Sequence, residues 1–262
     1  MLPSAADLQC IEKILRECGS ILMVCRTAGK TEGEWSGEQF KAAADKIAHD
    51  FLVTALGEAF PGIPVVSEED PASMSVCTAD HFIIDPIDGT ASFVHGFAGW
   101  VTQIAYVCAN RPVFAGIYAP SSDEYFSALR GNGAYCNGGR LSLSGSTRSA
   151  HSLIDNYPEA RGITQDLQQA LGIPVYVESG SIALKICRIA DRGADLFFKN
   201  MSPRDWDVAA PLLVLEEAGG FITDAQGFAL NLGGADRRHC GLIAAAHSAV
   251  IEQVADWYTS LK

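Results

Sequence analysis

Residues 81–90, HFIIDPIDGT, join a mostly apolar segment to two carboxylates three positions apart. The apolar side chains at 82–84 predict a buried strand, and Pro86 restrains the turn expected after it. Asp85 and Asp88 are therefore expected in fixed positions at the end of a strand. Carboxylate oxygens held in this way suit Mg²⁺, a hard cation that prefers carboxylate and water ligands.

Gly89 and Thr90 follow the second carboxylate where a helix is expected to begin, in ASFVHGF. Free backbone N–H groups at such a position can bind a phosphate. A single Asp at a helix start is more often a capping residue. Capping needs only one Asp, however, so the complete motif DPIDGT favours a site for both metal and phosphate.

Two further acidic segments flank this motif. The triplet 68–70 ends the strand-like PVVSEED, and a neighbouring strand could bring one of its glutamates beside Asp85, although a solvated loop is the alternative. Asp205 or Asp207 stands at the start of the apolar helix in DWDVAAPLLVLEEAGG, where capping is again the alternative. Separated acids at strand ends and helix starts are the arrangement that two metals in one cleft would require.

Helices are predicted at residues 5–25 and 42–60, because their apolar residues recur at helical spacing. The polar, Gly-containing segment between them, residues 28–40, is predicted to be a loop. Most of the strands expected in the first half of the chain follow the second helix. The clustering of helices and then strands indicates an α+β architecture for this half.

A Gly- and Ser-rich run at residues 130–149 is the best place for a boundary. After this run, predicted strands and helices alternate up to a last helix near the C-terminus. We therefore expect an α+β part over residues 1–145, which contains the metal and phosphate motifs. An α/β part over residues 146–262 is expected to contain the WD motif.

The composition restricts the partners of the protein. The chain of 262 residues has a net charge of −12, from 31 acidic against 19 basic residues, which argues against nucleic acid as a partner. Its eight cysteines form no CxxC pair or zinc spacing, so reduced thiols are expected. Charged residues interrupt the apolar N-terminal segment, which therefore resembles neither a signal peptide nor a membrane span. We expect a cytoplasmic protein that has no membrane partner.

The segments SEED, DPIDGT, and WDVAA followed by EAGG resemble, in order and spacing, the inositol monophosphatase family of Mg²⁺-dependent, lithium-sensitive phosphatases. GNGAYCNG and GSIALKIC extend the resemblance over nearly the whole chain. The resemblance implies an α/β fold, a layered αβαβα sandwich of the sugar-phosphatase type, and commonly a homodimer. It also implies two or three Mg²⁺ ions per site and a small phosphorylated metabolite as substrate.

The resemblance further implies roles for individual residues. The implied metal ligands are Glu68, Asp85, the carbonyl of Ile87, Asp88 and Asp207. The implied catalytic residues are Glu68, Asp45 and Thr90, of which Thr90 and Asp45 would orient the attacking water. The implied substrate-binding residues are Gly89, Thr90, Gly180, Ser181, Lys185, Lys199 and Asn200. The sequence alone would leave Asp45 as an acid on a helix surface.

The expected reaction is direct in-line attack of a metal-activated water on a phosphomonoester, without a covalent enzyme intermediate. The main rival is a phosphatase of the haloacid-dehalogenase type, which attacks through the first Asp of a DxDGT motif. Two residues separate the acids in DPIDGT, where that motif has one. This spacing favours Asp85 as a metal ligand over Asp85 as a nucleophile.

The expected substrate is of the inositol monophosphate type, with one competing possibility. Asn200 stands where related inositol phosphatases usually have a glutamate that contacts the inositol hydroxyls. Lys185 and Lys199, together with Arg204, favour a 3′(2′),5′-bisphosphate nucleotidase that acts on 3′-phosphoadenosine 5′-phosphate. The alternative is that the two lysines are surface charges. For the loop lysine that the resemblance implies before Asp45, the sequence offers Lys30 or Lys41.

A third possibility belongs to another functional class. The chain could be a regulatory protein that binds a protein or RNA and retains only residual phosphatase activity. The complete set of predicted metal ligands argues against this interpretation, and the negative net charge does not suit RNA.

Overall fold

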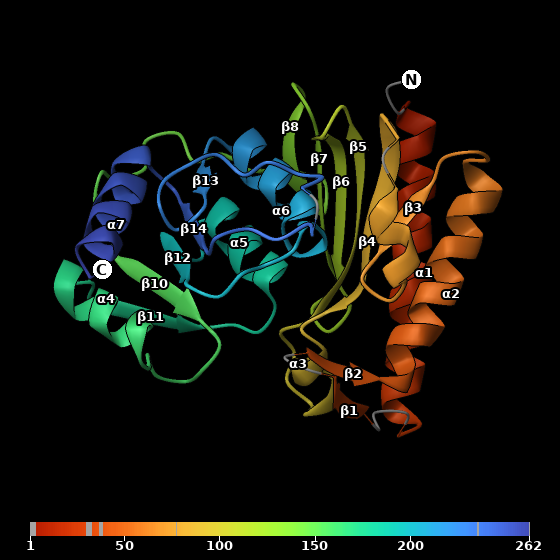
Figure 1. Cartoon of the computed structure of the whole chain (residues 1–262), viewed down its shortest axis with the longest axis horizontal. Helices are drawn as coiled ribbons and strands as arrows, with labels where there is room; N and C mark the ends of the chain where they lie inside the picture. The colour runs from red at the N-terminus through yellow and green to blue at the C-terminus, as the bar shows by residue number, and fades with distance from the viewer. Residues whose placement is uncertain (1–3, 30–32, 37–38, 77, 235, 262) are drawn as a thin grey trace.

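The computed structural model describes residues 4–29, 33–36, 39–76, 78–234 and 236–261. Within these ranges, two large β-sheets alternate with pairs of helices (Figure 1). Two helices cover the outer face of one sheet, two lie between the sheets and two cover the far face of the other sheet. The expected layered αβαβα sandwich is confirmed.

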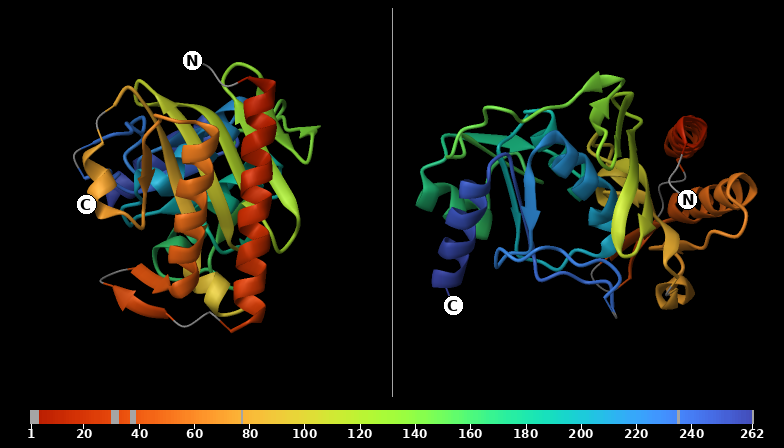
Figure 2. Two further views of the ribbon diagram at one scale, coloured as in Figure 1. Left: turned by 90° about the vertical axis from the view of Figure 1, so that its right-hand side faces the viewer. Right: turned by 90° about the horizontal axis from the view of Figure 1, so that it is seen from above.

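The first sheet has seven strands in the order β3-β4-β5-β6-β7-β8-β9. They are β3 (Val65–Ser67), β4 (Asp80–Asp88), β5 (Val101–Cys108), β6 (Arg111–Ala119), β7 (Glu124–Leu129), β8 (Gly133–Cys136) and β9 (Gly139–Arg140). The helices α1 (Ala5–Thr27) and α2 (Ala43–Ala59) lie across its outer face (Figure 2, left). The buried stripe of α1 contains Ile11, Leu15 and Leu22, as its helical spacing predicts.

The second sheet has five strands in the order β11-β10-β12-β14-β13. They are β10 (Ser152–Asp155), β11 (Val175–Glu178), β12 (Leu196–Lys199), β13 (Phe221–Thr223) and β14 (Leu242–Ala245). The helices α4 (Ile163–Leu171) and α7 (Ser248–Ser260) cover its outer face, whereas α5 (Ile182–Ala190) and α6 (Asp205–Ala218) fill the space between the sheets (Figure 2, right). Apolar side chains cover nearly the whole circumference of α6, because a sheet packs on each side of it.

The loop predicted over residues 28–40 is wrong in part. The strands β1 (Gly33–Ser36) and β2 (Gln39–Ala42) pair as an antiparallel hairpin, in which Gly33 lies opposite Ala42. Strand pairing satisfies the hydrogen bonds of backbone groups that a loop would leave to water. The polar composition of the segment gave no indication of this pairing. Lys30 lies outside the described residues, as does the side chain of Lys41.

The Gly- and Ser-rich run at residues 130–149 contains β8 and β9, which extend the first sheet as far as Arg140. The first strand of the second sheet begins at Ser152. A continuous apolar core joins the first sheet to α5, α6 and the second sheet. The division into parts at residue 145 stays a prediction.

The strand β4 does not end at Asp85, where the sequence predicted a turn, but continues through Pro86 to Asp88. Asp85 pairs with Gln103 and Asp88 pairs with Val101, so β4 advances three residues between these pairs where β5 advances two. This irregularity is a β-bulge. In a regular strand, residues three apart point to opposite faces, and the extra residue of the bulge removes that constraint. The bulge thus allows Asp85 and Asp88 to serve one site.

Candidate active site

A cavity of about 650 Å³ opens where the end of β4 meets the first residues of α5 and α6. All the residues predicted for the site line it except two, Asp45 and Asn200. The cavity therefore joins motifs that lie far apart in the sequence and belong to both sheets.

Three carboxylates form the centre of the cavity. Single oxygen atoms of Asp85, Asp88 and Asp207 all lie within 4.8 Å of one another. Glu68, at the end of β3, lines the same cavity and adds its negative charge near Asp85. Adjacent strands thus bring one glutamate of the SEED segment beside the DPIDGT motif, as the sequence indicated.

Burial and mutual repulsion disfavour the ionised form of these acids. Burial, followed by the charges of Glu68 and Asp88, raises the pKa of Asp85 well above its usual range. Burial also raises the pKa of Asp88, and burial with the charge of Asp88 raises the pKa of Asp207 to about 6. Such shifts are typical of functional sites.

The acids fit a bound divalent cation. The Oδ2 atom of Asp85 is buried and has no hydrogen-bond partner among the described residues. Within the same part of the chain, no Lys or Arg side chain forms an ion pair with any of the three carboxylates. Clustered carboxylates that form no ion pair are costly to bury unless a metal ion neutralises them.

Asp88 also holds the start of α5. Its two carboxylate oxygens accept hydrogen bonds from the backbone N–H groups of Ile182 (3.3 Å) and Ala183 (2.6 Å). A Cβ atom at Gly180 would lie 1.9 Å from the carbonyl oxygen of Gly99, so the close approach of these two segments requires glycine. Ser181, predicted to contact substrate, lines the cavity and also caps α5 through the N–H of Leu184.

Thr90 connects the cavity to Asp45 on α2. The Oγ1 atom of Thr90 lies 3.3 Å from Oδ1 of Asp45 and 3.0 Å from the carbonyl oxygen of Ile87. Asp45 is 3% exposed, so the expectation of a helix-surface acid is wrong. It lies behind Thr90 and does not line the cavity itself. Gly89, at φ +91°, supplies the left-handed turn that precedes Thr90.

The two acids of the DWD segment have different places. Asp207 lines the cavity and accepts a hydrogen bond of 2.6 Å from the N–H of Arg204, so it caps α6 as well. Asp205 is fully buried away from the cavity. The residues alone left both possible, whereas the family resemblance implied Asp207, and the helical phase brings only Asp207 to the cavity.

Lys185 is not a surface charge. Its side chain is 1% exposed, lies 3.7 Å from a carboxylate oxygen of Asp155 and packs over the ring of Phe197. Burial lowers its pKa to about 8. Lys199 is half-buried and lines the cavity, as predicted. Asn200 is exposed and outside the lining, so the structure does not bring it into the site.

Sequence reasoning missed several lining residues, among them Asn156 and Arg238. Asn156 follows directly after β10, at a strand end where polar residues often serve a site. Arg238 comes beside Arg204 through an isolated antiparallel bridge, which no local pattern signals. Together with Lys199, the two arginines make part of the cavity wall cationic.

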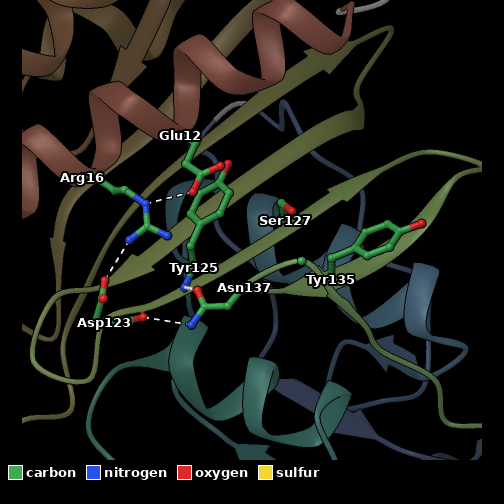
Figure 3. A pocket seen from close by; sticks show the side chains of 8 residues that line it. Glu12, Arg16, Asp123, Tyr125, Ser127, Tyr135 and Asn137 are labelled. Atoms are coloured by element: carbon green, nitrogen blue, oxygen red, sulfur yellow. Dashed lines mark hydrogen bonds and ion pairs between the residues drawn. The ribbon is translucent and has the colours of Figure 1, made fainter.

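A second cavity, of about 430 Å³, lies between α1 and the strands β7 and β8 (Figure 3). Arg16 extends from α1 and donates to Glu12 and to Asp123, at 2.8 Å in each case. Asn137 is also engaged, since it accepts from the N–H of Tyr125 and donates to the carbonyl of Asp123. The charged groups of this second cavity are paired with one another, and we call it the Arg16 cavity.

The chain matches the model of the inositol monophosphatase family over residues 5–258. It is 30% identical to bovine inositol monophosphatase 1, over 94% of this chain and 93% of that protein. Among solved structures, it resembles the Thermotoga maritima IMPase with a TM-score of 0.80 at 25% identity, over 97% of this chain and 99% of the other. The extragenic suppressor protein SuhB of Bartonella henselae gives a TM-score of 0.81 at 25% identity, over 96% and 98%.

Proposed function

Because the chain belongs to the inositol monophosphatase family, whose members are phosphatases, we propose that it hydrolyses a small phosphomonoester of the inositol monophosphate type. The family is metal-dependent, generally on Mg²⁺. The observation that carries the proposal is the group of Asp85, Asp88 and Asp207, which form no ion pair with a Lys or Arg side chain of the described residues.

We assign two or three Mg²⁺ ions to the cavity. Their ligands are the carboxylates of Glu68, Asp85, Asp88 and Asp207 and the carbonyl of Ile87, and all five residues line the cavity. When bound, the ions lower the pKa of a water molecule and neutralise charge on the phosphoryl oxygens.

The remaining groups orient the reactants. We assign to the hydroxyl of Thr90, in contact with Asp45, the role of accepting a hydrogen bond from the attacking water, and Asp45 would hold that hydroxyl in one orientation. Glu68 lines the cavity and its charge acts on Asp85, and we assign it to the same water. We assign the backbone N–H groups of Gly89 and Thr90 to the phosphate. Gly180, Ser181 and Lys185 complete the wall on the α5 side.

A second candidate is a substrate with two phosphates, of the 3′-phosphoadenosine 5′-phosphate type. The cationic wall formed by Lys199, Arg204 and Arg238 favours it, because each of these side chains could bind a second phosphate. Lys185 supports this candidate less than its sequence position suggested, since Asp155 already neutralises it.

Phosphate release with Mg²⁺ tests the proposal on inositol 1-phosphate, 3′-phosphoadenosine 5′-phosphate, fructose 1,6-bisphosphate and histidinol phosphate. We expect the highest kcat/KM on inositol 1-phosphate, complete loss in EDTA and recovery with Mg²⁺. Highest activity on the nucleotide would favour the second candidate. Release that EDTA does not affect would contradict the metal assignment, and no release from any substrate would favour a regulatory protein.

Three further properties are part of the proposal. Inhibition by Li⁺ is expected in the same assay. We also propose a homodimer, which light scattering after gel filtration would detect, and a cytoplasmic location. In the ranges that the structure describes, no helix has the length and apolar character needed to cross a membrane.

A further inference from the structure

Asp205 is the centre of a buried network behind the cavity. Its side chain is fully buried, and Oδ2 accepts hydrogen bonds from Nη1 of Arg237 (3.0 Å) and from the N–H of Gly233 (2.8 Å). Oδ1 lies 3.0 Å from Nε2 of His239. Asp205 is the first residue of α6, two positions before Asp207. The network therefore holds the helix end that places Asp207 in the cavity.

Arg237 reaches from this network to a second segment. Its side chain is 3% exposed, and Nη2 donates to the carbonyl of Val76 at 2.9 Å, while Nε lies 3.4 Å from the carbonyl of Met74. These carbonyls belong to the end of a 3₁₀ turn, Pro71–Ser75. A guanidinium can serve a carboxylate and two carbonyls at once, because its donors form a rigid planar fork.

The 3₁₀ turn is in turn fastened to the strand that ends beside Glu68. The hydroxyl of Ser73 accepts a hydrogen bond from the N–H of Ser67 (3.1 Å) and donates to the carbonyl of Asp70 (2.6 Å). Ser67 is the last residue of β3 and directly precedes Glu68. Contacts therefore run without interruption from Glu68 through the turn and Arg237 to Asp205 and α6.

We propose that Arg237 is a positioning residue, which sets the separation of the two chain segments that carry Glu68 and Asp207. The proposal rests on the metal site of the proposed function. Mg²⁺ demands near-ideal octahedral geometry, so ligands from different halves of the chain need a rigid connection. The bulge of β4 fixes Asp85 and Asp88 within one strand, whereas Glu68 and Asp207 belong to segments far apart in the chain. Arg237 connects these segments, in addition to the hydrogen bond from Nε2 of Gln103 on β5 to the carbonyl of Trp206 on α6.

Direct binding of Mg²⁺ to the metal-free protein, measured by titration calorimetry, tests this role without an activity assay. We expect Arg237→Met to raise the Kd for Mg²⁺ by about 10- to 100-fold, the range found for residues that support metal ligands. A folded Arg237→Met protein with the Kd of the wild type would overturn the proposal, whatever its melting temperature.

Arg130→Met is the matched control. Arg130 also joins a backbone carbonyl, that of Pro112 (2.8 Å), to a carboxylate on α6, that of Glu216 (3.1 Å). It does so at the C-terminal end of α6, away from the cavity, and is more exposed than Arg237. We expect the Kd for Mg²⁺ to stay within about twofold of the wild type. An equal loss in both variants would show a general effect of weakened packing and overturn the specific role.

Two milder variants keep the test valid if Arg237→Met does not fold. Arg237→Lys retains a positive charge beside Asp205 but loses the planar fork, so we expect a smaller rise in Kd. Ser73→Ala breaks the contacts at the other end, and its Kd should also rise. Normal Mg²⁺ binding by both folded variants would overturn the proposal. If the wild type itself bound no Mg²⁺, the proposed function would fail instead.

Discussion

The active-site cavity and the Arg16 cavity both contain carboxylates, but these form ion pairs in the Arg16 cavity and lie against one another in the active-site cavity. In the Arg16 cavity, the guanidinium of Arg16 pairs with both Glu12 and Asp123. In the active-site cavity, the carboxylates of Asp85, Asp88 and Asp207 face one another, and Lys185 pairs with Asp155 instead.

The energetic cost of the carboxylates distinguishes a cavity that stabilises the fold from a cavity that serves function. Paired charges at a partly exposed surface cost little and give a modest stabilisation. Buried carboxylates that repel one another destabilise the fold, and such an arrangement persists where a bound ion offsets it. Variants of Asp85, Lys185 and Lys199 change the active-site cavity, and variants of Asp123 and Arg16 change the Arg16 cavity.

The largest effect is expected from Asp85→Asn. Loss of one charged metal ligand should lower kcat by more than about 100-fold, because residues that only support ligands already contribute 10- to 100-fold. In EDTA, the free energy of unfolding should not fall, since the substitution removes repulsion and keeps the oxygen that accepts from the N–H of Ile87. Phosphate release and urea unfolding measure the two effects. We choose Asp85 over Asp88 because Asp88 also holds α5.

Asp123→Asn is the control from the Arg16 cavity, and its activity should stay within about twofold of the wild type. Activity of Asp85→Asn within about tenfold of the wild type, in saturating Mg²⁺, would exclude Asp85 as a ligand.

The next effect concerns the pH dependence of stability. The pKa of Lys185 is lowered from 10.5 to about 8 by burial, so between these values the unfolded state binds more protons than the folded state. The Lys185 contribution to the free energy of unfolding should therefore rise with pH over this range, by about 3 kcal/mol. Urea unfolding of the wild type and of Lys185→Met, from about pH 7 to about pH 10, measures this contribution as the difference between their free energies of unfolding. A difference that stays constant with pH would contradict the prediction.

A smaller effect is expected from Lys199→Met, which removes one charge from the cationic wall. If the wall binds a second phosphate, kcat/KM for a bisphosphate should fall by about 10- to 150-fold, corresponding to roughly 1.5–3 kcal/mol for a charge-assisted hydrogen bond. A matched monophosphate should be affected little. Equal losses on both substrates would assign Lys199 to the shared phosphate site, and no loss on either would leave the inositol-type monoester as the better candidate.

The smallest effect is expected from Arg16→Met. Its ion pairs and its contacts with the rings of Tyr118 and Tyr125 should together contribute about 1–2 kcal/mol to the free energy of unfolding. Thermal unfolding should show this loss, whereas kcat/KM should stay unchanged. A loss of activity larger than about tenfold in folded protein would mean that the Arg16 cavity takes part in function.

Much of this molecule could be predicted from local patterns. The helices α1 and α2, most of the strands and the alternation in the second half follow from the spacing of apolar residues. Failures occurred where backbone pairing decides the structure against composition. The polar segment that forms β1 and β2 is one example, and the passage of β4 through Pro86 is another.

The sequence by itself indicated the family, because motifs such as DPIDGT and WD are specific to it, and through that resemblance it implied the αβαβα architecture and the acids expected at the site. Only the tertiary structure decided that Asp205 is buried away from the cavity, where Lys185 finds its partner and how Arg237 joins two distant segments. Those outcomes depend on packing between residues far apart in the chain. No local pattern encodes a contact whose two sides are brought together only when both sheets have formed.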